Sequence, residues 1–250
     1  MTLLMISELN QNGVGDITHV FSGLITGILL IVVGVITLFR NRNNHVNQAF
    51  LGFLTGIGLY FCIDSSMFIY SEFAFDILNL LRDLSICCLI IGLSLGAFAT
   101  IIIQYGKSTA FNPRILIPWV IGSVLLVGLG IIGDSLMSGS DHHADAHFEY
   151  SRLFLGWIGI TGSMILFSLI ITVNLLMLIR DSTADFRIRL LKILAGFIII
   201  ISLLLIFDIG FTLEVIESLI ENLIIHISMH LGIIIGSILI LNAFWSPLTE

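Results

Sequence analysis

The chain alternates between seven long apolar stretches and short polar connections. The stretches cover residues 17–39, 48–70, 77–104, 115–136, 153–180, 190–213 and 219–245. Each is close to the roughly 20 residues that a helix needs to cross a bilayer. The pattern predicts an all-α bundle of seven transmembrane helices, and we expect a single domain over residues 1–250.

Composition supports a membrane location. Hydrophobic residues make up 57% of the chain, charged residues only 11%, and the mean hydropathy is +1.10. A soluble domain usually carries about 25% charged residues, so this class is excluded. The net charge of -7 argues against nucleic acid as a partner. The first sixteen residues lack the basic region of a secretory signal, so we expect the first apolar stretch to be retained as a helix.

Basic residues gather in alternate connections. Eight of the ten Lys and Arg residues flank the first, third and fifth connections: Arg40, Arg42, Lys107, Arg114, Arg180, Arg187, Arg189 and Lys192. Cytoplasmic connections of membrane proteins carry an excess of Lys and Arg. The pattern predicts a cell-membrane protein with the N-terminus outside and the C-terminus in the cytoplasm.

Glycines four residues apart recur in several stretches. The pairs are Gly23 and Gly27, Gly52 and Gly56, Gly92 and Gly96, and Gly232 and Gly236. Small residues with this spacing let helix backbones approach closely in a membrane, so we expect these glycines at helix contacts. We expect Pro118 in the first turn of the fourth helix, where its missing N–H has no consequence.

Several ionisable residues fall inside the apolar stretches. With the orientation above, all lie in the outer half of the bundle, on the second, third, sixth and seventh helices: Asp64, Asp83, Asp208, His226 and His230. Burying any one of these side chains without a partner would cost roughly several kcal/mol of free energy. We therefore expect the side chains to converge and pair. Arg82 precedes Asp83 and is expected to join the same polar network together with Asp208.

Two interpretations of this polar layer remain open. The first is a structural network that holds the helices together. The second is a metal site, because His226 and His230 lie one turn apart on one helix face. Two imidazoles and one carboxylate form a known catalytic-zinc donor set, which makes Asp64 the third candidate ligand.

The residues around the polar layer resemble the CREST superfamily of seven-helix membrane hydrolases, which includes the progestin/adiponectin receptors and alkaline ceramidases. The run from His226 to His230 matches the family's His-x-x-x-His motif, and Asp83 lies where the family has an Asp early in helix three. Where the family has a Ser and a His in helix two, this chain has Asp64, Ser65 and Ser66 and no histidine. Either Asp64 replaces that histidine or no zinc is bound.

The resemblance implies a zinc-dependent hydrolase that cleaves an amide or ester of a lipid. In that hypothesis His226, His230 and Asp64 hold the metal and Asp83 takes a proton from metal-bound water. Ser65 or Ser66 would stabilise the oxyanion.

The seven-helix plan also resembles the input domains of sensor histidine kinases, with Tyr105, Gly106 and Lys107 closing the third helix. This alternative implies a sensor or receptor that binds a small ligand or protons and signals to a cytoplasmic partner. The seventh helix is similar to that of microbial rhodopsins. However, Lys107 and Lys192 fall at helix ends, so a covalent retinal protein is excluded for lack of a membrane-embedded lysine.

The fourth connection is rich in histidine. It contains His142, His143 and His147 together with two aspartates. Such a segment is typical of a solvated loop, but it can also gather metal ions or titrate as an acid sensor. All three interpretations stay open, and in each of them the loop is not catalytic.

Overall fold

The computed structural model describes residues 14–69, 75–133, 154–212 and 219–245, and every described element is a helix or a turn. The helices are α2 (Val14–Arg40), α3 (His45–Ile69), α4 (Phe75–Tyr105), α5 (Lys107–Ala110), α6 (Pro113–Gly133), α7 (Phe154–Asp181), α8 (Ala184–Thr212) and α9 (Leu219–Trp245).

Seven of these helices are long and apolar enough to cross a membrane. The expected seven-helix architecture is therefore confirmed over the described residues, and the protein is a multi-pass membrane protein. All helix boundaries but one lie within three residues of expectation. Helix α8 begins at Ala184 rather than at 190, because its first turn is polar and an apolar pattern does not register it. The short α5 was not predicted, since four residues carry no periodic signal.

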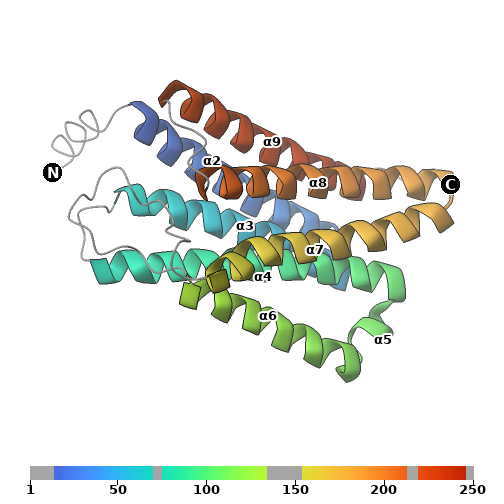
Figure 1. The fold of residues 1–250 in the computed structure, drawn as a ribbon. Helices are drawn as coiled ribbons and strands as arrows, with labels where there is room; N and C mark the ends of the chain where they lie inside the picture. Colours follow the sequence, from blue (N-terminus) through green and yellow to red (C-terminus); the bar gives the residue numbers. More distant parts are fainter. Residues whose placement is uncertain (1–13, 70–74, 134–153, 213–218, 246–250) are drawn as a thin grey trace.

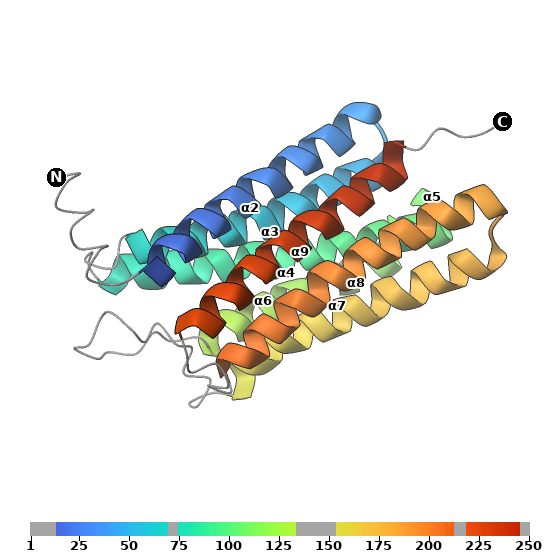
Figure 2. The ribbon, with the colours of Figure 1, turned by 90° about the horizontal axis from the view of Figure 1, so that it is seen from above.

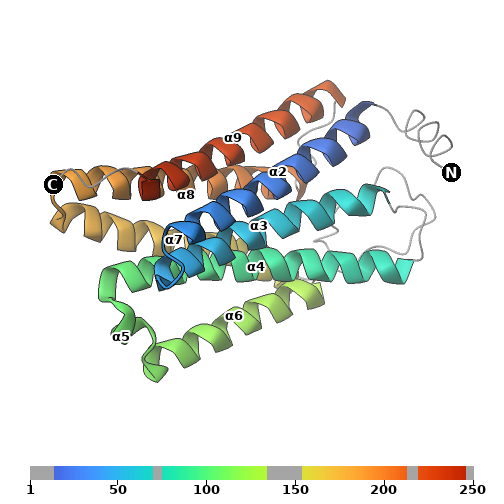
Figure 3. The same cartoon turned by 180° about the vertical axis from the view of Figure 1, so that it is seen from behind.

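Six helices form a closed ring. In chain order α2, α3, α4, α7, α8 and α9 each contact the next, and α9 closes the ring against α2 (Figures 1 and 2). Helix α6 lies outside this ring against α4 and α7 (Figure 3). In the most apolar segment of α4, 72% of residues are buried, against 6% in that of α6. Helix α4 is thus the most buried of the seven long helices, and α6 leaves most of its surface uncovered by protein.

Aromatic rings fill one part of the ring interior. The ring centroids of Phe53 on α3 and Phe197 on α8 lie 4.5 Å apart. Phe50, one turn earlier, contacts Phe197 at 5.7 Å and Phe244 of α9 at 4.8 Å. Aromatic pairs at such distances add to the packing energy beyond the area they bury. These contacts join α3, α8 and α9 across the centre of the ring.

Glycines mark the closest helix contacts. A methyl group added to Gly56 of α3 would lie 2.6 Å from the Cα of Gly92 on α4. The same addition at Gly236 of α9 would lie 2.9 Å from the carbonyl oxygen of Gly196 on α8. All four predicted glycine pairs lie against a neighbouring helix, as expected. Only glycine permits backbones this close.

Pro118 does not lie in the first turn of its helix. Helix α6 begins at Pro113, so Pro118 is its sixth residue and lies inside it. The expectation was wrong because the apolar pattern starts two residues after the helix does. Pro118 has no N–H to donate to the carbonyl of Arg114, and that carbonyl is left for other donors.

Replacing Gly56 by Ala should destabilise the bundle by about 1–3 kcal/mol, the range for overpacking a tight contact. The added methyl group would meet the Cα of Gly92 and the carbonyl oxygen of Cys88 at 2.7 Å. Gly122→Ala on α6 is the matched control, because nothing lies within 4 Å of its added carbon. The measurement is the midpoint of thermal unfolding in detergent. Equal midpoints for the two variants would contradict the assigned α3–α4 contact.

Candidate functional site

A buried ion pair joins α3 and α4 near one end of the bundle. The Nη1 of Arg82 donates a hydrogen bond to the Oδ1 of Asp64 at 3.3 Å. The side chains are 5% and 16% exposed, respectively. Asp64 lies five residues before the end of α3, about 7.5 Å along the axis. Burying either charge alone is costly, so the pair holds the two helix ends together.

His230 of α9 lies close to this pair. Its side chain is 2% exposed, and its ring centre is 5.2 Å from that of Phe61 on α3. Phe61 lies three residues before Asp64, so α9 meets α3 within one helical turn of the ion pair. The structure therefore brings Asp64, Arg82 and His230 into one region at the junction of three helices.

Two further predicted residues share this end of the bundle by their backbone positions. His226 lies one turn before His230 on α9, and Asp208 lies four residues before the end of α8. Their side chains fall outside the part of the structure that can be described. The predicted convergence of all five ionisable side chains stays a prediction.

The predicted catalytic residues point in different directions. Asp83 is half-buried and follows Arg82 on α4, about 100° further round the helix. Ser65 is buried, and a methyl group added to Gly23 of α2 would collide with its hydroxyl. Ser66 donates its hydroxyl hydrogen to the carbonyl oxygen of Cys62 at 2.6 Å. Ser65 therefore lies against α2, and the hydroxyl hydrogen of Ser66 is already used by the backbone.

The fit of these residues to zinc can be judged from Asp64. A guanidinium at 3.3 Å already neutralises its carboxylate, and a divalent cation placed beside it would be repelled by the charge of Arg82. Within the described residues, no group of three or more His, Cys, Asp or Glu side chains is arranged to hold a metal. The contact thus favours an ion pair over metal ligation for Asp64. The histidines of the fourth connection, His142, His143 and His147, lie outside the described residues.

Comparison with known proteins finds no match. No protein-family model matches the chain, and no curated protein or solved structure is significantly similar to it. The class that the fold defines is a seven-helix multi-pass membrane protein, with an ion pair near one end of the bundle and a buried histidine about one turn deeper.

The sequence did not predict the direct partner of Asp64. Both Asp64 and Arg82 lie within about two turns of the ends of consecutive helices joined by a short connection. Consecutive antiparallel helices usually pack side by side, and this placement is the signal that could have paired them. Phe61, which marks the approach of α9, carries no sequence signal of its own.

Arg82→Gln should destabilise the protein by about 3 kcal/mol, the lower end of the range for breaking one side of a buried pair, because Asp64 keeps some exposure. The double variant Arg82→Gln/Asp64→Asn should be more stable than either single variant, since it leaves no lone buried charge. A double-mutant cycle of thermal unfolding in detergent measures the coupling. Arg180→Gln, at an exposed pair with Asp181, is the control and should have little effect. Additive effects of the two single changes would show that the charges do not interact.

Proposed function

We propose that this protein is a seven-helix sensor or receptor whose polar site at the Arg82–Asp64 pair binds a small ligand or protons. The observation that carries the proposal is the ion pair itself, buried between α3 and α4 with His230 one turn away. Apolar residues of similar volume at these two positions would often stabilise the fold as well as the ion pair does. Stability alone therefore does not explain why the two charged residues are there. An ionisable group in a membrane segment is, by default, a candidate functional site.

Two kinds of event would break this pair. An anionic ligand would compete with Asp64 for the guanidinium of Arg82, because guanidinium binds carboxylates in a bidentate manner. A proton on Asp64 would remove the attraction altogether. Either event leaves α3 and α4 with a different preferred packing, and α3–α4 contacts continue through Gly56 and Gly92 toward the other end. This pair of helices is the element that would carry a signal across the membrane.

The orientation of the chain is part of the proposal. The eight basic residues named above lie at the end of the bundle opposite to the ion pair. The positive-inside rule supports placing that end in the cytoplasm. The N-terminus and the site would then face outward, and the α2–α3 and α7–α8 connections would meet a cytoplasmic signalling partner.

For a sensor, a panel of small carboxylates should contain at least one that raises the unfolding temperature of the native protein. A ligand at 100 times its dissociation constant stabilises by about 2.7 kcal/mol. Arg82→Gln should abolish the effect, whereas Arg180→Gln should preserve it. The same ligand, or mild acid, should change hydrogen exchange in residues 40–48 at the opposite end. If neither carboxylates nor acid produce a change that depends on Arg82, the sensor proposal is wrong.

A second candidate, the zinc-dependent hydrolase of lipid amides or esters, is supported by one observation. His230 is buried in α9 against α3, and His226 lies one turn away on the same helix. Two imidazoles at this spacing are a common part of a zinc site. In this candidate Asp83 is the base, and a residue other than Asp64 supplies the third ligand unless Arg82 moves away.

Metal analysis of the purified protein separates the two candidates. The sensor proposal expects less than stoichiometric zinc and no loss of stability in chelator. The hydrolase expects about one zinc per chain, lost in His226→Ala and in His230→Ala. In that case Asp83→Asn should keep the metal and lose turnover. His45→Ala, at the opposite end of the bundle, is the matched histidine control and should leave the metal content unchanged.

A further inference from the structure

The end of the bundle opposite to the ion pair carries a surface of cations without carboxylates. It consists of two segments, residues 39–48 between α2 and α3 and residues 105–114 around α5, and neither contains an Asp or Glu. The four cations are exposed: Arg40, Arg42, Lys107 and Arg114. We call these two segments together the cationic surface.

Side-chain contacts hold the two segments together. The ring centres of His45 and Phe111 lie 5.3 Å apart, and Phe111 also packs on Phe98 of α4 at 5.5 Å. Ala110 of α5 is fully buried beside them. Figures 2 and 3 both show the α2–α3 connection and α5 at the same end of the bundle. The cations are therefore carried by one ordered surface.

Three exposed asparagines on this surface present donors. They are Asn41, Asn44 and Asn112, and each side-chain oxygen accepts a hydrogen bond from the backbone N–H two residues further on, at 3.3, 2.8 and 3.0 Å. The acceptor atom of each amide is thus occupied, and the NH2 group remains available as a donor. A surface of cations and amide donors without carboxylates is suited to an anion.

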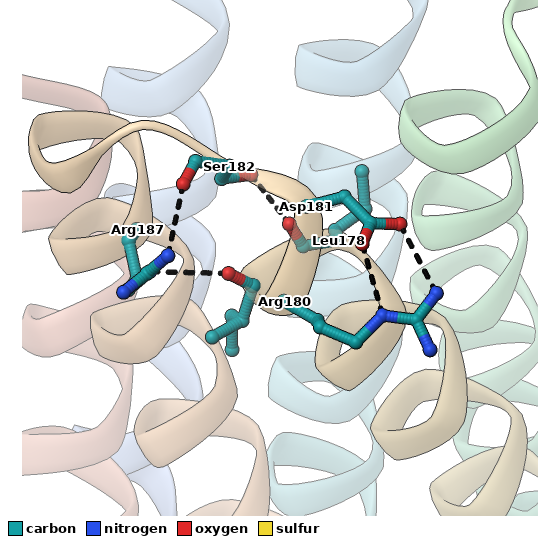
Figure 4. Close-up of polar contacts among 6 residues, drawn as sticks. Leu178, Arg180, Asp181, Ser182 and Arg187 are labelled. Carbon is teal, nitrogen blue, oxygen red and sulfur yellow. Dashed lines mark hydrogen bonds and ion pairs between the residues drawn. The ribbon is translucent and has the colours of Figure 1, made fainter.

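The remaining basic connection, between α7 and α8, is different. Arg180 pairs with Asp181 at 2.9 Å (Figure 4). Arg187 donates to the backbone carbonyl oxygens of Ile179 and Ser182 at 3.2 and 3.1 Å. Cations in this connection already have acceptors within the protein, so they attract an external anion less strongly.

An apolar track leads away from the cationic surface along α6. Ile117, Ile121 and Leu125 lie on the same helix face as Arg114 and are 56%, 54% and 61% exposed. Exposed Phe39 and Tyr105 lie at the same end of the bundle, where interfacial aromatic residues are common. A head group at Arg114 would therefore have a place for its acyl chain beside α6. An acidic protein segment would not gain from contact with these apolar side chains.

We propose that the cationic surface binds the phosphate head group of an anionic phospholipid, with one acyl chain lying along α6. Arg42 and Arg114 offer planar guanidinium groups that match phosphate oxygens, and Lys107 adds a point charge. The binding does not depend on the sensor or hydrolase proposals, because it uses neither the Arg82–Asp64 pair nor the histidines of α9, and it shares only the α2–α3 connection with the proposed signalling output.

The test compares two triple variants of the full chain in nanodiscs of phosphatidylcholine with added phosphatidylglycerol. The site variant carries Arg42→Gln, Lys107→Gln and Arg114→Gln. The control variant carries Arg180→Gln, Arg189→Gln and Lys192→Gln, which removes the same charge from the α7–α8 region. Native mass spectrometry after extraction counts the phosphatidylglycerol molecules retained by each protein.

The site variant should retain at least about tenfold less phosphatidylglycerol than the native protein, since each cation near a membrane surface contributes about fivefold. The control variant should lose less than about twofold, and retention of phosphatidylcholine should be unchanged in both. Should the triple variant fail to fold, the double variant Lys107→Gln/Arg114→Gln provides the same comparison.

Equal losses in the site and control variants would mean general charge attraction only and would overturn the proposal. A parallel binding assay with a polyglutamate probe tests for an acidic protein partner. The proposal would also be overturned if the site variant kept its phosphatidylglycerol but lost polyglutamate binding, because the surface would then be a site for an acidic protein.

Discussion

The close approach of α3 and α4 at Gly56 and Gly92 is the constraint on which the rest of the arrangement depends. Lipid is as apolar as the helix surfaces, so helices associate through tight packing rather than through a hydrophobic drive. The absence of side chains at these two positions lets the backbones meet, with the added carbon of Gly56 only 2.6 Å from the Cα of Gly92. Moving along both helices from this contact brings Asp64 and Arg82 to the same level.

The polar chemistry of the molecule is divided between the two ends of the bundle. At one end, Arg82 is buried and pairs with the partly buried Asp64, which compensates for the loss of solvent around the two charges. At the other end, basic side chains such as Lys107 and Arg114 are exposed. Five residues before the end of α4 at this second end, Asn174 of α7 donates to the hydroxyl of Thr100 at 3.1 Å, a buried hydrogen bond that joins α7 to α4. A signal between the ends would have to pass along the packed helices that connect them.

The hydrolase and sensor interpretations depend on different residues. The hydrolase interpretation of the sequence used Asp64 as a metal ligand, yet Asp64 contacts Arg82, so another residue would have to supply the third ligand. The sensor interpretation needs a polar group whose state can change and a helix pair that reports the change. The Arg82–Asp64 contact between α3 and α4 is the observation on which the sensor proposal rests.

The sequence by itself determined the number and kind of helices. A stretch of about 20 apolar residues can satisfy its backbone in lipid only as a helix, so seven such stretches specify the architecture without any tertiary information. It also located the close contacts at Gly56 and Gly92, since that spacing has a direct physical meaning.

The tertiary structure decided which helices are neighbours and which charges pair. The most apolar segments of α4 and α6 have nearly the same hydropathy, yet α4 is the most buried of the seven long helices and α6 the least. Nothing in a one-dimensional pattern distinguishes them, because a lipid-facing and a protein-facing residue have the same polarity in a membrane. The depth of Asp64 could be estimated from its position along α3. Its pairing with Arg82 could not, because it depends on how α3 and α4 are rotated about their axes.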